Sequence, residues 1–337
     1  MKITPNASLL PYNTFGINAC ADYIVEYESV SDLLEVLKSE NVKSNRILPV
    51  GSGSNLLFLN DFKGVILHSV IKSIQKINEN ADSVFLEVGS GVVWDDFVAY
   101  CVENGLGGVE NLSLIPGETG ASAVQNIGAY GVEVRDVIVE VHAVEIESAV
   151  GHTFSNLECH YGYRESIFKN ELKGKFIVTS VVFKMDKKPS FKLNYSKLEE
   201  EVLKTGCISL QTVRDTIIAI RQSKLPDTKS MGNAGSFFMN PVISKHHFLE
   251  LQAEYPQVPH YFVSETEEKV PAGWLIEQCG WKGKSIGNAS VHDKQALVIV
   301  NRGGATGAEI VFLAEQIQHS VKDKFGIILQ PEVNFIS

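Results

Sequence analysis

Two glycine-rich segments of the chain combine small residues with side chains that can hydrogen-bond an anion. The first is GSGSN at residues 51–55, which follows a predicted strand over residues 46–50. Glycine adopts positive φ angles readily and lets a ligand approach the backbone, and successive N–H groups can bind an anion. Ser52, Ser54 and Asn55 add side-chain hydrogen bonds. The segment does not match GxGxxG and begins no predicted helix, so a Rossmann site is not indicated. Taken alone, it is most simply an ordinary Gly-Ser turn.

The second segment is LIPGETGASAVQNIGAYG at residues 114–131. Its small residues keep bulk away from the backbone, at a cost in chain entropy that close contact with a flat, rigid ligand would offset. A helix and loop packed tightly against a sheet is the alternative interpretation. Because the two small-residue segments occur in one chain, together they predict a bound dinucleotide.

Three further residues are candidates for binding a carboxylate or for acid–base chemistry. Arg164, in YGYRES, has a planar fork with paired donors for a carboxylate, although a surface salt bridge is the common fate of an arginine. Ser236, in GNAGSFF, follows Gly235 and has no His or Asp nearby in sequence, so it is not predicted to be an acyl-transfer nucleophile. Glu332, in QPEVNF, follows a proline, which also fits a solvated glutamate on an edge strand.

Composition excludes several classes of protein and site. The net charge of −10 over 337 residues argues against broad nucleic-acid or anionic-membrane binding. The five cysteines are widely spaced and form no CxxC pair, so reduced thiols are expected rather than disulfides or zinc. His246, His247 and His292 lack metal-ligand spacing, so no metal site is predicted. We see no secretory signal and no run of 18 apolar residues, and we therefore expect a cytoplasmic protein with no membrane association.

The elements that must position these residues form an α+β pattern, with strands and helices unevenly interleaved. The helical pattern ends at SKLPD, directly after the helix predicted at residues 211–222. Helices are predicted at residues 31–40 with Ser31 as N-cap, 93–104, 211–222 and 306–322. Strands are predicted at residues 46–50, 64–70, 84–88, 137–147, 176–184, 295–301 and 326–336, the last interrupted by Pro331.

The order of the motifs resembles a known family. A strand, then GSGSNLL, then IPGETGASAVQNIGAYG is similar to the FAD-binding domain of the vanillyl-alcohol-oxidase and p-cresol-methylhydroxylase superfamily. YGYRESIFK at 161–169, RQSKLPDTKSMGNAGSFFMNP at 221–241 and LQPEVNFI at 329–336 extend the likeness. Within that superfamily the chain resembles the UDP-N-acetylenolpyruvoylglucosamine reductase family, from about residue 49 to residue 336.

The resemblance implies an enzyme of peptidoglycan synthesis with FAD as cofactor and NADPH as co-substrate. It would reduce UDP-N-acetylglucosamine enolpyruvate to UDP-N-acetylmuramate. Neither glycine-rich segment contains His or Cys, so the FAD should be non-covalent. The implied FAD-binding residues are Gly51, Ser52, Gly53, Ser54, Asn55, Leu56, Pro116, Gly117, Thr119, Gly120, Ala121, Gln125, Asn126, Gly128, Ala129, Tyr130 and Gly131.

The resemblance also assigns roles at the substrate. Arg164 would hold the substrate carboxylate, Ser236 would protonate carbon, and Glu332 would stabilise the enolate. Tyr195, in KLNYSKL, matches the tyrosine that closes over substrate in the longer type of the family. The implied substrate-binding residues are Tyr195, Arg221, Lys224, Asn240 and Gln278. Solvated charges for Arg221 and Lys224, and a core position for Tyr195, are the alternatives.

The family's architecture implies four parts in the chain. Residues 1–71 and 72–217 would be two FAD-binding subdomains, 218–322 a substrate domain, and 323–337 a C-terminal strand returning to the FAD site. We expect a monomer whose partners are the UDP-sugar substrate and NADPH, with no nucleic acid. A flavin oxidase of the same superfamily and a non-catalytic nucleotide-binding protein are the rival interpretations.

Overall fold

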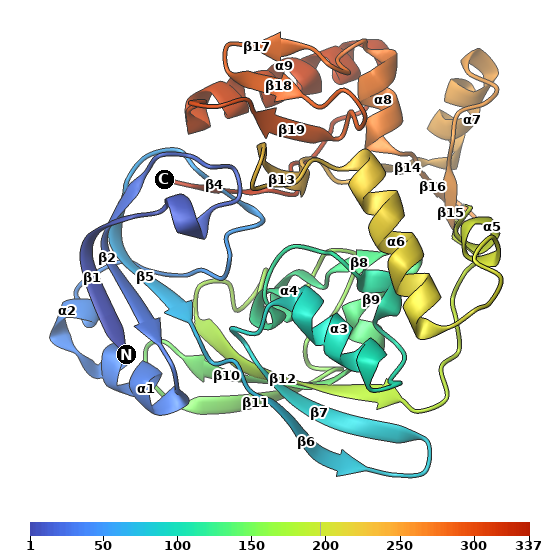
Figure 1. Ribbon diagram of the computed structural model, residues 1–337. Helices are drawn as coiled ribbons and strands as arrows, with labels where there is room; N and C mark the ends of the chain where they lie inside the picture. The colour runs from blue at the N-terminus through green and yellow to red at the C-terminus, as the bar shows by residue number, and fades with distance from the viewer. Residues whose placement is uncertain (196) are drawn as a thin grey trace. The chain divides into compact units, whose positions relative to one another are not determined.

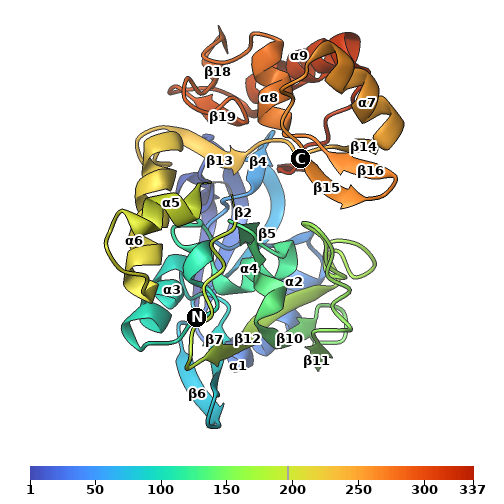
Figure 2. The same ribbon diagram turned by 90° about the vertical axis from the view of Figure 1, so that its right-hand side faces the viewer.

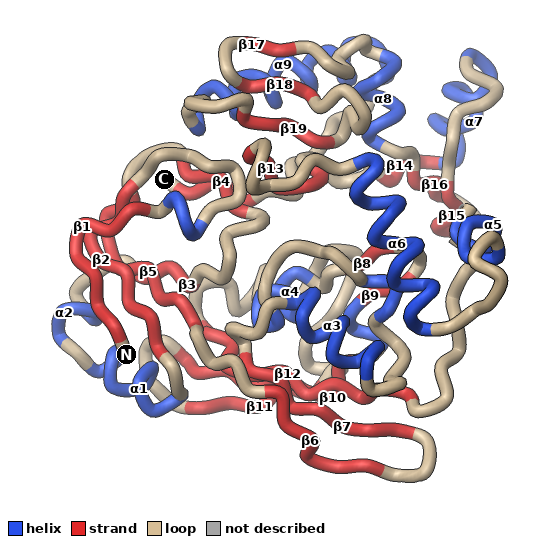
Figure 3. Tube along the Cα trace, viewed as in Figure 1, coloured by secondary structure: helices blue, strands red, loops and turns tan. Residues whose placement is uncertain are grey.

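The computed structural model describes residues 1–195 and 197–337, which mix helices and strands throughout (Figure 3), so the predicted α+β class is confirmed. The described chain divides into two compact units. Unit 1 comprises Met1–Ala7, Ala21–Ser52 and Lys63–Ser223. Unit 2 comprises Ser8–Cys20, Gly53–Phe62 and Lys224–Ser337. The four parts that the sequence predicts remain a prediction.

Unit 1 is built on two sheets. The first has the strand order β1-β2-β5-β3, with β3 and β5 parallel; its strands are β1 Lys2–Ser8, β2 Cys20–Tyr27, β5 Phe62–Ser69 and β3 Ile47–Pro49. The second is antiparallel in the order β11-β10-β12-β7-β6; its strands are β11 Gly151–Ser155, β10 Ile138–Glu145, β12 Phe176–Asp186, β7 Ser83–Gly89 and β6 Ile74–Glu79.

Two helices cover one face of the five-stranded sheet, as Figure 1 shows: α3 (Trp94–Glu103) and α4 (Thr119–Gln125). Trp94 and Phe97 of α3 pack on Phe183 of β12, with ring centroids 6.0 and 4.8 Å apart. Burying large aromatic side chains is the main stabilising contribution of such a core. The glycine-rich segment 114–131 contains α4 and is therefore anchored on this sheet.

The remaining helices of unit 1 lie at its edges. Helix α1 (Val30–Lys38) buries Leu33, Val36 and Leu37 against strands of both sheets. Helices α5 (Leu198–Leu203) and α6 (Leu210–Lys224, whose last residue belongs to unit 2) share a small apolar cluster. The shorter elements are α2 Glu40–Lys43, η2 Glu110–Leu112, η3 Val134–Asp136, β8 Gly128–Ala129 and β9 Val132–Glu133.

Unit 2 contains a sheet in the order β13-β19-β18-β17, along which α9 (Gly307–Phe325) packs, with α8 (Ala272–Gln278) against α9 (Figure 2). Its strands are β13 Gly232–Ser236, β19 Val298–Asn301, β18 Ala289–Val291 and β17 Ser285–Ile286. A second sheet, β14-β16-β15, packs on α7. The other elements are β14 Val242–Ser244, β16 Glu267–Lys269, β15 Tyr261–Ser264, α7 Lys245–Glu254, η1 Leu10–Tyr12, β4 Leu56–Phe58 and β20 Asn334–Ile336.

The predicted elements are mostly confirmed, with two corrections at their ends. The N-cap of the first helix is Ser29, whose hydroxyl accepts from the backbone N–H of Asp32, and not Ser31. The final strand is Asn334–Ile336 only, because Pro331 has no N–H for a ladder and forms an isolated bridge with Phe238. None of the helices in the described part of the chain combines the length and apolar character needed to cross a bilayer.

Candidate functional site

Backbone strain in unit 1 concentrates around the second glycine-rich segment. Leu114, Asn126, Tyr130 and Arg164 have φ angles of 56°, 46°, 49° and 58°. Non-glycine residues rarely adopt the left-handed region, and such outliers persist only where surrounding contacts enforce them, often at functional sites. The strain therefore indicates that segments 114–131 and 161–164 form one region whose backbone is held by the surrounding contacts.

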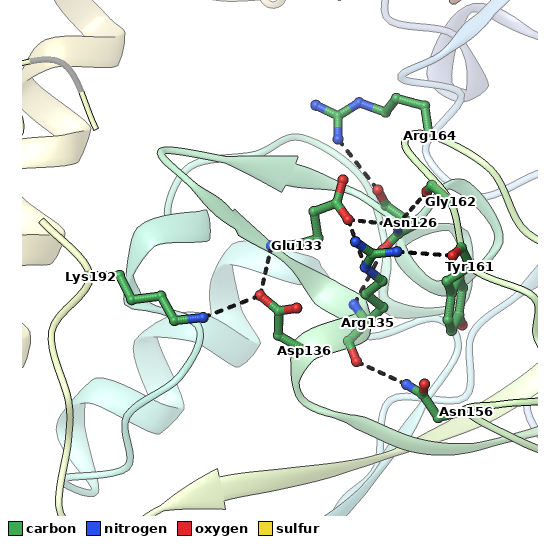
Figure 4. Close-up of polar contacts among 9 residues, drawn as sticks. All are labelled: Asn126, Glu133, Arg135, Asp136, Asn156, Tyr161, Gly162, Arg164 and Lys192. Atoms are coloured by element: carbon green, nitrogen blue, oxygen red, sulfur yellow. Dashed lines mark hydrogen bonds and ion pairs between the residues drawn. The ribbon is translucent and has the colours of Figure 1, made fainter. Parts of the chain in front are cut away.

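The side chain of Arg164 lies on this segment (Figure 4). Its Nη2 donates to the carbonyl oxygen of Gly128 at 2.5 Å, and Nη1 lies 3.4 Å from the carbonyl oxygen of Asn126. The ammonium of Lys169 donates to the Arg164 carbonyl oxygen at 2.6 Å. A methyl group on Gly128 would lie 2.9 Å from Nη1 of Arg164, so only glycine lets the guanidinium approach this closely.

Asn126 is the centre of the hydrogen bonds drawn in Figure 4. Its Nδ2 donates to the carbonyl oxygen of Gly162 at 2.7 Å and lies 3.3 Å from Oε2 of Glu133, while its Oδ1 accepts from the backbone N–H of Arg135 at 3.2 Å. The Asn126 amide thus holds the segment that carries Arg164. The FAD contact that the sequence predicts for Asn126 remains a prediction.

Glu133 and Arg135 complete this support, and the sequence analysis missed both. Their side chains form an ion pair of 2.8 Å, and Arg135 Nη1 donates to the carbonyl oxygen of Tyr161 at 2.9 Å. Asn156 Nδ2 donates to the Arg135 carbonyl oxygen at 2.8 Å, and the Lys192 ammonium lies 3.5 Å from Asp136. The missed signal is VEVRD at residues 132–136, which directly follows the glycine-rich segment.

Tyr130, Tyr195 and Arg221 lie in the same unit. The rings of Tyr130 and Tyr195 meet edge to face with centroids 5.9 Å apart. The Nε of Arg221 is buried and has no hydrogen-bond partner among the described residues. Burial lowers the pKa of Arg221, opposed by the nearby Tyr130 and Asp95. A buried guanidinium with an unsatisfied donor is typical of an anion-binding position.

Asp95 fixes the helix that carries Arg221. Its carboxylate receives two hydrogen bonds from Arg214, at 2.7 and 2.9 Å, and one from the backbone N–H of Leu114 at 2.5 Å. Burial alone would raise the pKa of Asp95, but these donors outweigh it and lower the pKa. The bidentate pair ties α6 to α3 at the start of the glycine-rich segment.

Three segments distant in sequence align in unit 2. The backbone N–H of Glu332 donates to the carbonyl oxygen of Phe237 at 2.8 Å, next to Ser236. The side-chain amide of Asn55 donates to the carbonyl oxygen of Glu332 at 3.1 Å. Beyond it, β20 pairs in parallel with β4, from Asn334 opposite Leu56 onwards. The structure therefore brings Asn55, Ser236 and Glu332 together.

Ser236 owes its position to an irregularity in β13. The register with β19 shifts between Asn233 and Ser236, and Gly235 has φ of 68°. The side chain of Asn233 accepts from the backbone N–H of Gly235 at 2.9 Å, which fixes the bend. A bulge of this kind reorients the next side chain in the strand.

Segment 51–55 is where the chain passes from unit 1 to unit 2. The hydroxyl of Ser52 is buried and has no hydrogen-bond partner in the described part of the chain. Gly53 has φ of 64°, and a methyl group there would lie 1.9 Å from the carbonyl oxygen of Tyr12. The close approach of the Tyr12 backbone accounts for the glycine at position 53. The buried, unsatisfied hydroxyl of Ser52 fits a loop that receives a polar cofactor.

The other predicted site residues differ in their hydrogen bonds and in their exposure. The N–H groups of Thr119 and Gly120 donate to the carbonyl oxygens of Val92 and Ser90, at 2.9 and 3.0 Å. Asn240 Oδ1 accepts from the backbone N–H of Ala272 at 2.9 Å. Lys224 and Gln278 are exposed. Their roles, like those of the other site residues, remain predictions.

Comparisons with known proteins agree on one family. Residues 226–336 match the family model for the UDP-N-acetylenolpyruvoylglucosamine reductase C-terminal domain, and residues 21–152 match that for an FAD binding domain. The UDP-N-acetylenolpyruvoylglucosamine reductase of Bacteroides fragilis is 53% identical over 98% of both chains. That of Porphyromonas gingivalis is 50% identical over 100% of both.

A solved structure shares the fold. The crystal structure of UDP-N-acetylenolpyruvylglucosamine reductase from Thermus caldophilus matches with a TM-score of 0.69 and 22% identity, covering 100% of this chain and 98% of that one. The likeness covers helices and sheets of both units.

Proposed function

The chain belongs to the UDP-N-acetylenolpyruvoylglucosamine reductase family, and from this premise we propose how its residues carry out the reaction. It is an FAD-dependent oxidoreductase that reduces UDP-N-acetylglucosamine enolpyruvate, with NADPH as co-substrate, in peptidoglycan precursor synthesis. The product is UDP-N-acetylmuramate. The assignments below concern the individual residues.

We propose that the two glycine-rich segments hold the FAD. Ser52, Ser54 and Asn55 would bind its pyrophosphate, and residues 116–131 would lie against its ring system. The buried hydroxyl of Ser52, which lacks a partner among the described residues, supports this placement. When bound, FAD supplies a ring that carries hydride from NADPH to the enolpyruvyl group. The absence of His and Cys from both segments supports non-covalent binding.

Arg164 is proposed to bind the carboxylate of the enolpyruvyl group. Negative charge that develops next to this carboxylate delocalises into it, so a fixed cation stabilises the transition state more than the ground state. The carbonyl oxygens of Asn126 and Gly128 pre-orient the guanidinium. Such pre-orientation avoids reorganisation when the charge develops.

Ser236 is proposed to donate a proton to the substrate carbon, and Glu332 to stabilise the enolate. The observation that carries this proposal is the hydrogen bond from the backbone N–H of Glu332 to the carbonyl oxygen of Phe237, the residue that follows Ser236. A serine hydroxyl is a weak acid, but a carbanion-like enolate is a strong enough base to take its proton.

Substrate phosphates are proposed to bind Arg221, Lys224 and Asn240, with Tyr195 closing over the nucleotide and Gln278 contacting it. The unsatisfied, buried Nε of Arg221 supports an anionic ligand there. We further propose that the enzyme acts as a monomer in the cytoplasm. We also propose that it has no nucleic-acid partner, which the net charge of −10 supports.

Substitution Ser236→Ala tests the proposal by separating the two half-reactions. Reduction of the flavin by NADPH requires no proton on the substrate carbon and should proceed at the normal rate. Reoxidation by the enolpyruvyl sugar should slow by about 10²–10⁴-fold, the usual contribution of general-acid catalysis. Stopped-flow absorbance of the flavin measures both rates.

The matched control is Ser230→Ala, an exposed hydroxyl bonded to the Asp227 carbonyl oxygen at 3.0 Å. It should leave both rates unchanged. Equal slowing of both half-reactions in Ser236→Ala would indicate a damaged FAD site, and unchanged reoxidation would show that another group supplies the proton.

A further inference from the structure

A buried carboxyl group lies beside the first glycine-rich segment and has no role in the mechanism above. Glu118, in IPGETG, is 8% exposed. A methyl group on Gly51 would lie 2.9 Å from Oε2 of Glu118, so the carboxyl rests directly against the backbone of Gly51. Burial raises the pKa of Glu118 to about 8, and the nearby Lys72 only partly offsets this.

His68 is the neighbour of Glu118 on strand β5. Its Nδ1 lies 3.0 Å from the carbonyl oxygen of Val50, which can only accept, so Nδ1 carries a proton. Its Nε2 lies 4.0 Å from Oε1 of Glu118. A protonated carboxyl group of Glu118 can donate a hydrogen bond toward this nitrogen after a small rotation.

With its proton in place, the carboxyl group of Glu118 carries no charge. Loss of that proton would leave one negative charge against Gly51. The residues that face the pair from other elements are Tyr27 on β2 and Lys72 after β5. Burial raises the pKa of Tyr27 to about 12, so its hydroxyl stays protonated while Glu118 titrates. Lys72 favours the ionised carboxylate but does not restore the usual pKa of Glu118.

We propose that Glu118, beside His68, is a proton-linked positioning element for the cofactor, which favours binding of the FAD pyrophosphate when its carboxyl group carries a proton. The proposal rests on the proposed placement of FAD at residues 51–56. A pyrophosphate at Ser52, Ser54 and Asn55 is negatively charged, and so is Glu118 once it has lost its proton. Like charges at short range in a water-poor site repel strongly.

The linkage has a definite sign. Because bound pyrophosphate raises the cost of ionising Glu118, FAD binding favours the protonated carboxyl group and takes up a proton near the pKa of about 8. Affinity for FAD should therefore fall as the pH rises through this value. A coupling of typical size predicts that the Kd of the apoprotein for FAD rises roughly five- to tenfold from about pH 7 to about pH 9.

Titration of apoprotein with FAD, followed by quenching of flavin fluorescence at several pH values, tests this without any turnover. Isothermal titration in buffers of different ionisation enthalpy should show proton uptake near pH 8 in the wild type. Glu118→Gln keeps the shape and a donor but cannot ionise, so its Kd should stay constant across the range. Glu103→Gln, at the exposed end of α3, should keep the wild-type dependence.

The outcomes separate this inference from the function it rests on. Failure of wild-type apoprotein to bind FAD at any pH would refute the proposed cofactor site itself. Tight binding with the same Kd at both ends of the range, or a Glu118→Gln variant with the wild-type pH dependence, would refute the proton linkage alone. If Glu118→Gln does not fold, the pH profile of the wild-type Kd and the proton uptake measured in the different buffers decide the question.

Discussion

Arg164 and the Ser236–Glu332 pair are positioned by different means. The guanidinium of Arg164 rests on residue 126, only 38 positions away in sequence, through hydrogen bonds that involve side chains. Glu332 meets the segment of Ser236 through a hydrogen bond from its backbone N–H to the carbonyl oxygen of Phe237, and β20 just beyond it pairs in parallel with β4. The first arrangement is local and held by individual side chains, whereas the second is non-local and held by strand pairing.

The difference teaches which substitutions each region should tolerate. Removing one side chain from a network leaves buried partners unsatisfied, which costs more than the lost bond. Backbone pairing is insensitive to most side-chain changes but responds to changes in φ and register. The Arg164 region should therefore respond to changes of polar side chains, and the Ser236 region to changes of glycine.

Of the three substitutions that compare the Arg164 and Ser236 regions, Arg164→Lys should have the largest effect on catalysis. Lysine keeps the charge but loses the fork that the carbonyl oxygens of Asn126 and Gly128 orient. Losing a pre-oriented donor at a developing charge typically costs about 10²–10³-fold, here in the rate of flavin reoxidation by substrate. Flavin reduction by NADPH should stay normal in the same stopped-flow experiment.

Arg302→Lys, at an exposed arginine of unit 2, is the control. A normal rate of flavin reoxidation in Arg164→Lys would show that the guanidinium fork has no part in the mechanism.

Asn126→Ala should have the next largest effect, and it tests whether Asn126 supports Arg164 or binds FAD. Loss of the amide frees the Gly162 carbonyl oxygen and the Arg135 N–H. A displaced guanidinium should slow reoxidation by roughly ten- to a hundredfold and raise the KM for the sugar nucleotide. A support role leaves the Kd for FAD unchanged, whereas a direct FAD contact weakens it. Asn104→Ala, which removes a side-chain bond to the Tyr100 carbonyl oxygen at the end of α3, should change none of these values.

The sequence predicted the long elements well because their periodicity is strong. The helices α3, α6 and α9 begin and end close to their expected limits. Strand β13 was not predicted, because GNAGS lacks the alternation of a strand and contains the bulge that positions Ser236. Its pairing with β19 depends on residues more than sixty positions downstream, and no local pattern records such a pairing.

For the site, the sequence indicated residues within short motifs and missed those that support them. Glu133 and Arg135 are ordinary charged residues in sequence, and only the fold shows that they form an ion pair beneath the Arg164 segment. The burial of Glu118 was equally invisible, because a glutamate in a glycine-rich loop is usually solvated. Motifs reveal which residue types could do chemistry. Whether a side chain is buried, and which residues it contacts, depend on tertiary packing.

Gly235→Ala should have the smallest effect on catalysis, and it tests whether the backbone of β13 positions Ser236. The φ of 68° at Gly235 costs an L-residue about 1–2 kcal/mol, whereas an added methyl group meets nothing within 4 Å. The bulge should relax to escape this strain and shift the Ser236 hydroxyl, which slows reoxidation by roughly tenfold or less. Gly206→Ala is the matched control, because Gly206 has φ of 87° and equally open space but lies in unit 1 between α5 and α6. Both variants should lose similar stability in a urea titration, and only Gly235→Ala should slow reoxidation. If the two variants have the same reoxidation rate, the bulge does not position Ser236. The proposed difference between the Arg164 region and the Ser236 region then does not hold for the Ser236 region.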